Sequence, residues 1–192
     1  MANINFPLAM IAVLDESGVS ITSKEHTFDS TDGGSIEASI SGLSSEPTTV
    51  SASDIDFYIS QRGTGSLELD LSLFELSDQQ EADILGYEYD EATKTIKHGT
   101  RTNPPYVAVI LKSSDPKTGE DLYFGLTRGK LSKSDVEFNT NTTDGVEPNT
   151  VGLTGKFAAR PLDGLAYTKH RAPAGSSVKD WIDLVFNRTV TP

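Results

Sequence analysis

The residues that most often bind metals or transfer protons are sparse in this sequence. Its three histidines, His26, His98 and His170, stand far apart, and none belongs to a pair at the spacing of metal ligands. Cysteine is absent, so the chain has no thiol nucleophile, no thiolate metal site and no disulfide. We therefore do not expect a zinc site.

Three segments resemble ligand-binding loops without matching them. Gly125–Lys130 and Gly152–Lys156 contain glycine and lysine, but their glycine spacing is too short for a Walker loop, and strand glycines explain them better. Asp29–Gly33 lacks the alternating carboxylates and final glutamate of a calcium loop, which favours a turn. No Gly-x-Ser-x-Gly elbow occurs. We therefore expect no cofactor and no enzymatic activity. A hydrolase whose active site carries no recognisable sequence motif is kept as the least favoured hypothesis.

Charge is distributed unequally along the chain. The net charge is −12, with −14 from residues 1–99 (4 Lys and Arg, 18 Asp and Glu) and +2 from residues 100–192 (12 and 10). Proteins that grip nucleic acid cluster their basic residues, so this pattern argues against such a function. It fits a solvated surface, an acidic face that meets a more basic face of another copy, or a passage along which phosphate slides without sticking.

The chain of 192 residues is long enough for one domain, residues 1–192. The apolar stretch Phe6–Leu14 has no basic leader and runs into acidic residues, which favours a first strand over a signal peptide. With Val19–Thr22 it predicts an opening hairpin. No stretch approaches the roughly 18 apolar residues of a membrane helix, so no membrane association is expected.

The longest apolar segments predict a hairpin at the centre of the fold. Pro104 and Pro105 precede Tyr106–Leu111, an apolar run typical of a buried strand. Leu122–Leu131 returns after a polar turn at residues 113–120, in which proline and glycine favour the required backbone angles.

The clearest alternation lies at residues 67–73. Leucine occupies every odd position, and Glu68, Asp70 and Ser72 lie between the leucines. In a strand this pattern puts all four leucines on one face and both acids on the other. One face of this sheet must therefore be wet or contact something polar.

Two segments predict helices, and several others predict short strands. Ser77 and Gln80 form a capping box, and Gly86 ends the helix that follows. Apolar residues in Ser177–Phe186 recur at helical spacing, which favours a helix or a docking tail over a strand. Short strands are expected at 36–40, 55–59, 136–138, 151–157 and 165–168.

Two polar stretches interrupt these elements. Residues 24–53 are expected to form a long loop around one half-exposed strand, and residues 139–149 form a second loop. Loops of this length are usually functional or become ordered against a partner.

Several short motifs also occur in a recognisable order. They are Gly65–Leu71, Asp83–Tyr87, Pro104–Ala108, Tyr123–Leu126 with Gly129 and Lys130, and Leu153–Gly155. In this order and spacing, over roughly residues 5–170, the chain resembles the major tail proteins of long-tailed bacteriophages, in particular the phi13-type family of Gram-positive hosts.

The resemblance implies a mainly β tail-tube fold, with two packed β-sheets as a sandwich or barrel, one flanking short helix, a long polar loop and terminal arms. It implies a structural subunit of the virion tail, assembled in the host cytoplasm, that joins copies of itself into stacked hexameric rings. The inner sheets of a ring would form a continuous barrel around a lumen, through which DNA passes without specific binding. Tape-measure, tail terminator and distal tail proteins are the implied partners.

The same resemblance suggests roles for individual residues. Glu68 and Asp70 would face the lumen, while Gly42, Leu43 and Pro47 would belong to the ring-stacking loop, and residues 171–192 would form a C-terminal arm. The alternative is a monomeric β-sandwich binding module that recognises carbohydrate or a host surface. That alternative predicts a cluster of exposed aromatic side chains on one sheet.

Overall fold

A computed structural model describes residues 4–52, 55–61, 63–133 and 150–188. This part of the chain forms one eight-stranded sheet, two small two-stranded sheets and two helices. In chain order the elements are β1 (Ile4–Leu14), β2 (Ser20–Phe28), β3 (Ser35–Ser41), β4 (Thr48–Ala52), β5 (Ile55–Ser60), β6 (Leu67–Leu73), α1 (Asp78–Leu85), β7 (Glu88–Asp90), β8 (Thr95–Lys97), β9 (Val107–Ser114), β10 (Asp121–Lys133), β11 (Val151–Phe157), β12 (Tyr167–Ala172) and α2 (Lys179–Phe186).

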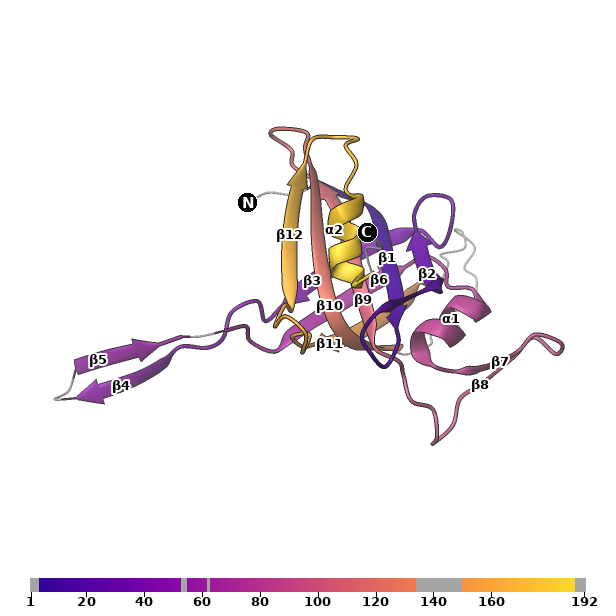
Figure 1. The fold of residues 1–192 in the computed structure, drawn as a ribbon, viewed down its shortest axis with the longest axis horizontal. Coiled ribbons are helices and arrows are strands. Elements are labelled where there is room, and N and C mark those ends of the chain that lie inside the picture. The colour runs from indigo at the N-terminus through magenta and orange to yellow at the C-terminus, as the bar shows by residue number, and fades with distance from the viewer. Residues whose placement is uncertain (1–3, 53–54, 62, 134–149, 189–192) are drawn as a thin grey trace, which may run out of the picture.

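The long strand β10 belongs to two layers. The main sheet has the order β2-β1-β9-β10-β11-β6-β3, and β12 pairs with the first half of β10. The second half of β10, Gly129–Lys133, pairs with β11 instead. At the change Thr127 is buried and donates a 2.5 Å hydrogen bond to the carbonyl of Leu165. One layer is therefore β12-β10-β9-β1-β2 and the other is β10-β11-β6-β3, and their strands cross in Figure 1.

The main core lies between these two layers. All four leucines of β6 are buried there, together with residues from the inner faces of β1, β9, β10 and β11 and with Ile84 and Leu85 of α1. Burial of a leucine side chain stabilises a fold by about 1.5–3 kcal/mol relative to its exposure. The register of β6 is thus determined by its alternating sequence.

A second core lies on the opposite face of β1, β9 and β10, beneath α2. Ala12, Ile110 and Tyr123 pack there against Val185 and Phe186 of the helix. The end of α2 is held by the buried Arg160, whose guanidinium donates to the carbonyls of Leu184 and Val185. The same guanidinium forms a two-fold contact with Asp163, at 2.6 and 3.2 Å.

Most of the predicted elements are confirmed. The fold is mainly β with packed sheet layers, Phe6–Leu14 lies in β1, and the opening and central hairpins form as β1-β2 and β9-β10. Helix α1 has the predicted capping box, with Ser77 as N-cap and Gly86 in the left-handed conformation after its last turn. The 177–186 segment contains a second flanking helix, α2, in agreement with the helical interpretation.

Other predictions need correction. The segment 24–53 contains more strand than expected. β3 (35–41) confirms the strand expected at 36–40, but β2 also continues to Phe28 and β4 begins at Thr48, so the rest is not one long loop. Polar residues of β2 remain in the strand because distant groups pair with them, such as Asp83 with Lys24 at 2.8 Å. The C-terminal segment from 171 to 188 is not a free arm, since α2 buries Val185 and Phe186 against the sheet.

Further differences concern the ends and the small hairpins. The strand expected at 165–168 runs instead from Tyr167 to Ala172. The hairpin β7-β8 and the strand β4 were not predicted. The strand expected at 136–138 and the loop expected at 139–149 lie outside the described residues.

Candidate functional site

The outward side of the layer β10-β11-β6-β3 is a polar surface, which we call the polar face. Its side chains alternate with those that point into the core, as the sequence of β6 predicted. In the strand registers Lys156 lies opposite Glu68, and Thr154 opposite Asp70. A shallow depression of about 400 Å³ runs across it. The polar face consists of Lys130, Ser132, Thr154, Lys156, Glu68, Asp70, Ser72, Glu37, Ser39 and Ser41.

The polar face carries both signs of charge. Lys156 Nζ lies 3.1 Å from Glu68 Oε1, in an ion pair that solvent screens because the lysine is largely exposed. Lys130 donates a 2.8 Å hydrogen bond to Asn103 Oδ1. Asp70 is exposed and Glu68 half-exposed. Both predicted acids are therefore accessible to a polar partner, and sequence reasoning missed the two lysines beside them.

Both margins of the polar face end in strand edges. β3 is the terminal strand of the main sheet. On the other side, pairing between β9 and β10 ends at Gly129, opposite Val107. The chain before β9 contains Pro104 and Pro105, which have no backbone N–H to continue that pairing. No other described strand pairs with either edge, and unpaired strand edges can pair with another chain.

A hairpin, β4-β5, projects far from the two layers (Figure 1). We call residues 42–66 the arm. The predicted stacking residues Gly42, Leu43 and Pro47 lie between β3 and the hairpin, and Leu43 is 44% exposed. Gly42 directly follows Ser41, which pairs with Glu68, so the base of the arm adjoins the polar face.

The base of the arm is tightly built. Gly42 has a φ of +71°, and a Cβ atom there would come within 1.8 Å of the carbonyl oxygen of Ser66. On the opposite strand a Cβ at Gly65 would meet the carbonyl oxygen of Ser44 at 2.5 Å. Gln61 also donates a 2.6 Å hydrogen bond to the carbonyl of Ser45. We call this place, where Gly42 lies against Ser66 and Gly65 against Ser44, the neck of the arm. Glycine is required there, because the two chain segments approach too closely for any side chain.

An apolar groove of about 230 Å³ opens beside the neck, between the two layers. Its lining includes Phe6, Ile40, Leu43, Phe124 and Tyr167. Burial raises the pKa of the Tyr167 hydroxyl, which keeps this group neutral over a wide pH range.

A histidine and a carboxylate meet at the contact between β2 and α1. His26 Nε2 lies 3.4 Å from Asp83 Oδ2 without forming a hydrogen bond, and burial holds the pKa of His26 below its ordinary value. Asp83 also binds Lys24, at 2.8 Å, and accepts from Gln79. Lys24 and His26 of β2 thus contact Asp83 of α1 and join the helix to the strand. We interpret this cluster as structural, because the Asp83 carboxylate is already surrounded by partners from the chain.

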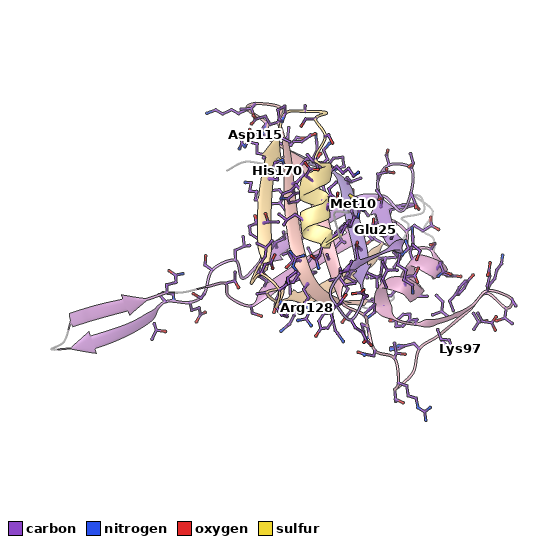
Figure 2. The ribbon with its side chains drawn as sticks, viewed as in Figure 1. Met10, Glu25, Lys97, Asp115, Arg128 and His170 are labelled. Atoms are coloured by element: carbon purple, nitrogen blue, oxygen red, sulfur yellow. The ribbon has the colours of Figure 1, made fainter. Side chains whose placement is uncertain are left out.

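Other charged groups pair at the far end of the molecule. Figure 2 shows Asp115 and His170 towards one end of β12, and Arg128, a residue of β10, far from them towards the opposite end of this layer. Arg171 pairs with Asp115 at 2.9 Å and with Glu120 at 2.7 Å, and its hydrogen bond lowers the pKa of Glu120. At the other end the Arg128 guanidinium lies 3.8 Å from the ring centre of Tyr106.

Over the residues that the structure describes, no cluster of three or more His, Asp or Glu side chains could hold a metal ion.

The comparison with known protein families identifies this architecture. Residues 1–169 match the family model described as phage tail tube protein. The chain belongs to the phage tail tube protein family. It is a structural protein of the virion tail, and membership in this family implies that copies assemble into a tube. A comparison with curated proteins found no match.

Family membership confirms the resemblance to phage major tail proteins and argues against the binding-module alternative. That alternative required a cluster of exposed aromatic side chains. Among the residues whose side-chain exposure is described, which leaves out 49–60, the exposed large aromatic residues are Phe74, after β6, and Tyr106, before β9. These two lie on separate parts of the molecule. Among the described helices, none is both long and apolar enough to cross a membrane.

Proposed function

We propose that this protein forms hexameric rings that stack into a tube, and that the polar face lines the lumen through which DNA passes. The observation that carries this proposal is the layer β10-β11-β6-β3, which is apolar on one side, polar on the other and bounded by two strand edges. Such a layer can continue from one copy to the next without exposing its leucines.

The strand directions suit this closure. β3 runs antiparallel to β6, β6 to β11 and β11 to β10. If the β3 edge of one copy meets the Gly129–Lys133 edge of its neighbour, the new pair is antiparallel as well. A ring built in this way has no free edge in its inner wall, which removes the tendency of open edges to aggregate.

The charges of the polar face suit a passage for DNA. Glu37, Glu68 and Asp70 repel phosphate, and the ion pair with Glu68 moderates the attraction of Lys156. Phosphate contacts with basic residues supply most non-specific binding to DNA. Lumen-facing Glu68 and Asp70 would therefore let DNA slide without being held.

The arm is the proposed stacking element, with Gly42, Leu43 and Pro47 at its base. A two-stranded hairpin alone is only marginally stable in water, so the projecting β4-β5 pair needs a partner. Rings that meet head-to-tail form an open polymer with no intrinsic end. We therefore propose that tail terminator and distal tail proteins bind the two ends and that a tape-measure protein sets the length.

Size-exclusion chromatography with light scattering over a concentration series tests this function. Early-eluting material imaged in negative stain should contain rings, or tubes with a central channel. Assembly should be repeated with the tape-measure partner, because a subunit can wait for an initiator. A chain that forms neither rings nor tubes under both conditions would refute the proposal.

A further inference from the structure

Two large apolar side chains are exposed at the end of β3 and β6 that lies farthest from the arm. Ile36 is 48% exposed and Phe74 is 50% exposed. Ile36 lies at an irregularity in the register of β3, and Phe74 immediately follows β6. We call these two residues the rim patch. Single exposed apolar residues are common on proteins, but two on neighbouring strands suggest a contact surface.

The backbone around the rim patch is held in place. Phe74 N donates a 2.8 Å hydrogen bond to the carbonyl of Gly34, and Glu75 N donates one of 3.0 Å to that of Gly33. Both glycines have positive φ, and a Cβ at Gly34 would lie 3.1 Å from Phe74 Cβ. The rim patch is thus a pre-formed surface, which lowers the entropy cost of binding.

The arm and the rim patch terminate the same two strands at opposite ends. In Figure 1 the β4-β5 hairpin projects from one side, while α1, which begins shortly after Phe74, lies on the other side. The sequence of the hairpin contains Val50, Ile55, Phe57, Tyr58 and Ile59. A copy translated along the strand direction would bring its arm to the rim patch of the copy ahead.

We propose that the rim patch receives the arm of a second copy of this chain, in the adjacent ring. The inference rests on the proposed function, because it names the surface to which the stacking arm binds. It is a heterologous contact between unlike surfaces, which propagates along a tube and does not close into a dimer.

Charge indicates what drives this contact. The arm, residues 42–66, contains three acidic residues, Glu46, Asp54 and Asp56, and one basic residue, Arg62, so its net charge is −2. The rim patch is flanked by exposed Glu37 and Glu75. Both surfaces are therefore acidic, so the attraction must come from apolar burial against a weak repulsion. Salt screens exposed charges, with a Debye length of about 10 Å at 0.1 M falling to about 3 Å at 1 M. Stacking should consequently strengthen as the salt concentration rises.

The first test compares Phe74→Asp with Leu184→Asp. Leu184 is 49% exposed on α2 and provides a matched control for placing a charge on an exposed apolar site. Phe74→Asp should reduce sedimentable tubes at least tenfold and leave single rings, while Leu184→Asp should assemble as the unmodified chain does. Thermal melting of both variants verifies that the subunit remains folded. Normal tube yield from Phe74→Asp would overturn the proposal.

The second test uses the absence of cysteine from the chain. A Phe74→Cys, Tyr58→Cys double variant should give a ladder of disulfide-linked multimers after oxidation of assembled tubes, because a disulfide requires Cα atoms within about 7 Å. The Leu184→Cys, Tyr58→Cys control should give none. The arm cysteine is also moved to Phe57 and to Ile59 in turn, so that neighbouring positions along β5 are tested. If none of these arm positions becomes linked to the rim patch in tubes, the proposal is wrong.

The failure of this inference can be distinguished from failure of the proposed function. If the unmodified chain forms neither rings nor tubes, the proposed function fails and the inference fails with it. If tubes form but persist in Phe74→Asp, or form no arm-to-rim links, only the rim patch is refuted. If both aspartate variants lose stacking, the disulfide experiment decides between support and refutation.

Discussion

Substitution of Gly42 by alanine should change the orientation in which the arm projects from the sheet. Gly42 has a φ of +71°, where a residue with a side chain costs about 1–2 kcal/mol. In addition, the new Cβ would lie 1.8 Å from the carbonyl oxygen of Ser66, whereas real Cβ contacts stay above 3.0 Å. The neck strands must therefore separate by at least 1.2 Å (3.0 − 1.8), which disturbs the base on which the hairpin is held.

The same loop provides a matched control. Gly63 has a φ of +75°, and a Cβ there would meet no heavy atom within 4 Å. Gly63→Ala therefore incurs the conformational cost alone, and the difference between the variants isolates the clash at the neck. Tube yield by sedimentation and tube length in negative stain should fall sharply for Gly42→Ala and little for Gly63→Ala. Equal assembly by the two variants would refute the assignment of a structural role to the tight neck.

Three further predictions concern the lumen, α2 and pH. Glu68→Lys with Asp70→Lys should leave assembly intact but cause short duplex DNA to co-sediment with tubes at low salt; tubes that still bind no DNA would contradict the lumen assignment. Arg160→Leu should lower the free energy of unfolding by about 3 kcal/mol, because charged hydrogen bonds at the end of α2 are lost. The fluorescence of Trp181, the only tryptophan, should change before the rest of the chain unfolds, because α2 then detaches first. Burial holds the pKa of His26 below its ordinary value of 6.5, so the unfolded chain binds the proton more readily. The free energy of unfolding should therefore fall as the pH drops below about 6.5, by at most about 1.4 kcal/mol per pH unit. Urea unfolding of His26→Gln should show a weaker fall, and an identical pH dependence would exclude His26 as the cause.

Local sequence was sufficient where the physical cause is local. The alternating leucines of β6 predicted a strand with one buried and one wet face because side chains alternate with a period of two. The capping box at Ser77 and Gln80 predicted the start of α1 because its hydrogen bonds join residues three apart.

The errors arose where distant residues decide the structure. Glu25 and His26 resemble loop residues, but they remain in β2 because Arg188 and Asp83 contact them from far along the chain. The lysines of the polar face escaped attention because only the registers of β10, β11 and β6 bring Lys130 and Lys156 near Glu68. Nothing local identifies these partners.

The pairing of β4 with β5 into a projecting hairpin was not predicted, for a related reason. Residues 48–60 show no continuous alternation, and the projecting direction of the hairpin depends on the close approach of Gly42 to Ser66 and of Gly65 to Ser44. A glycine in the sequence indicates conformational freedom, but it does not reveal which other strand will pass beside it.

The division of β10 between two layers has a mechanical consequence. A single strand of 13 residues pairs with β12 and β9 along its first half and with β11 along its second half. The layers are therefore joined by peptide bonds as well as by packed side chains, and they cannot shear past each other without breaking the hydrogen-bond ladders along β10. A load applied at α2 or β12 passes through continuous backbone into β11 and β6. In a long filament that bends, each subunit should accordingly move as a rigid body, and the deformation should concentrate in contacts between copies.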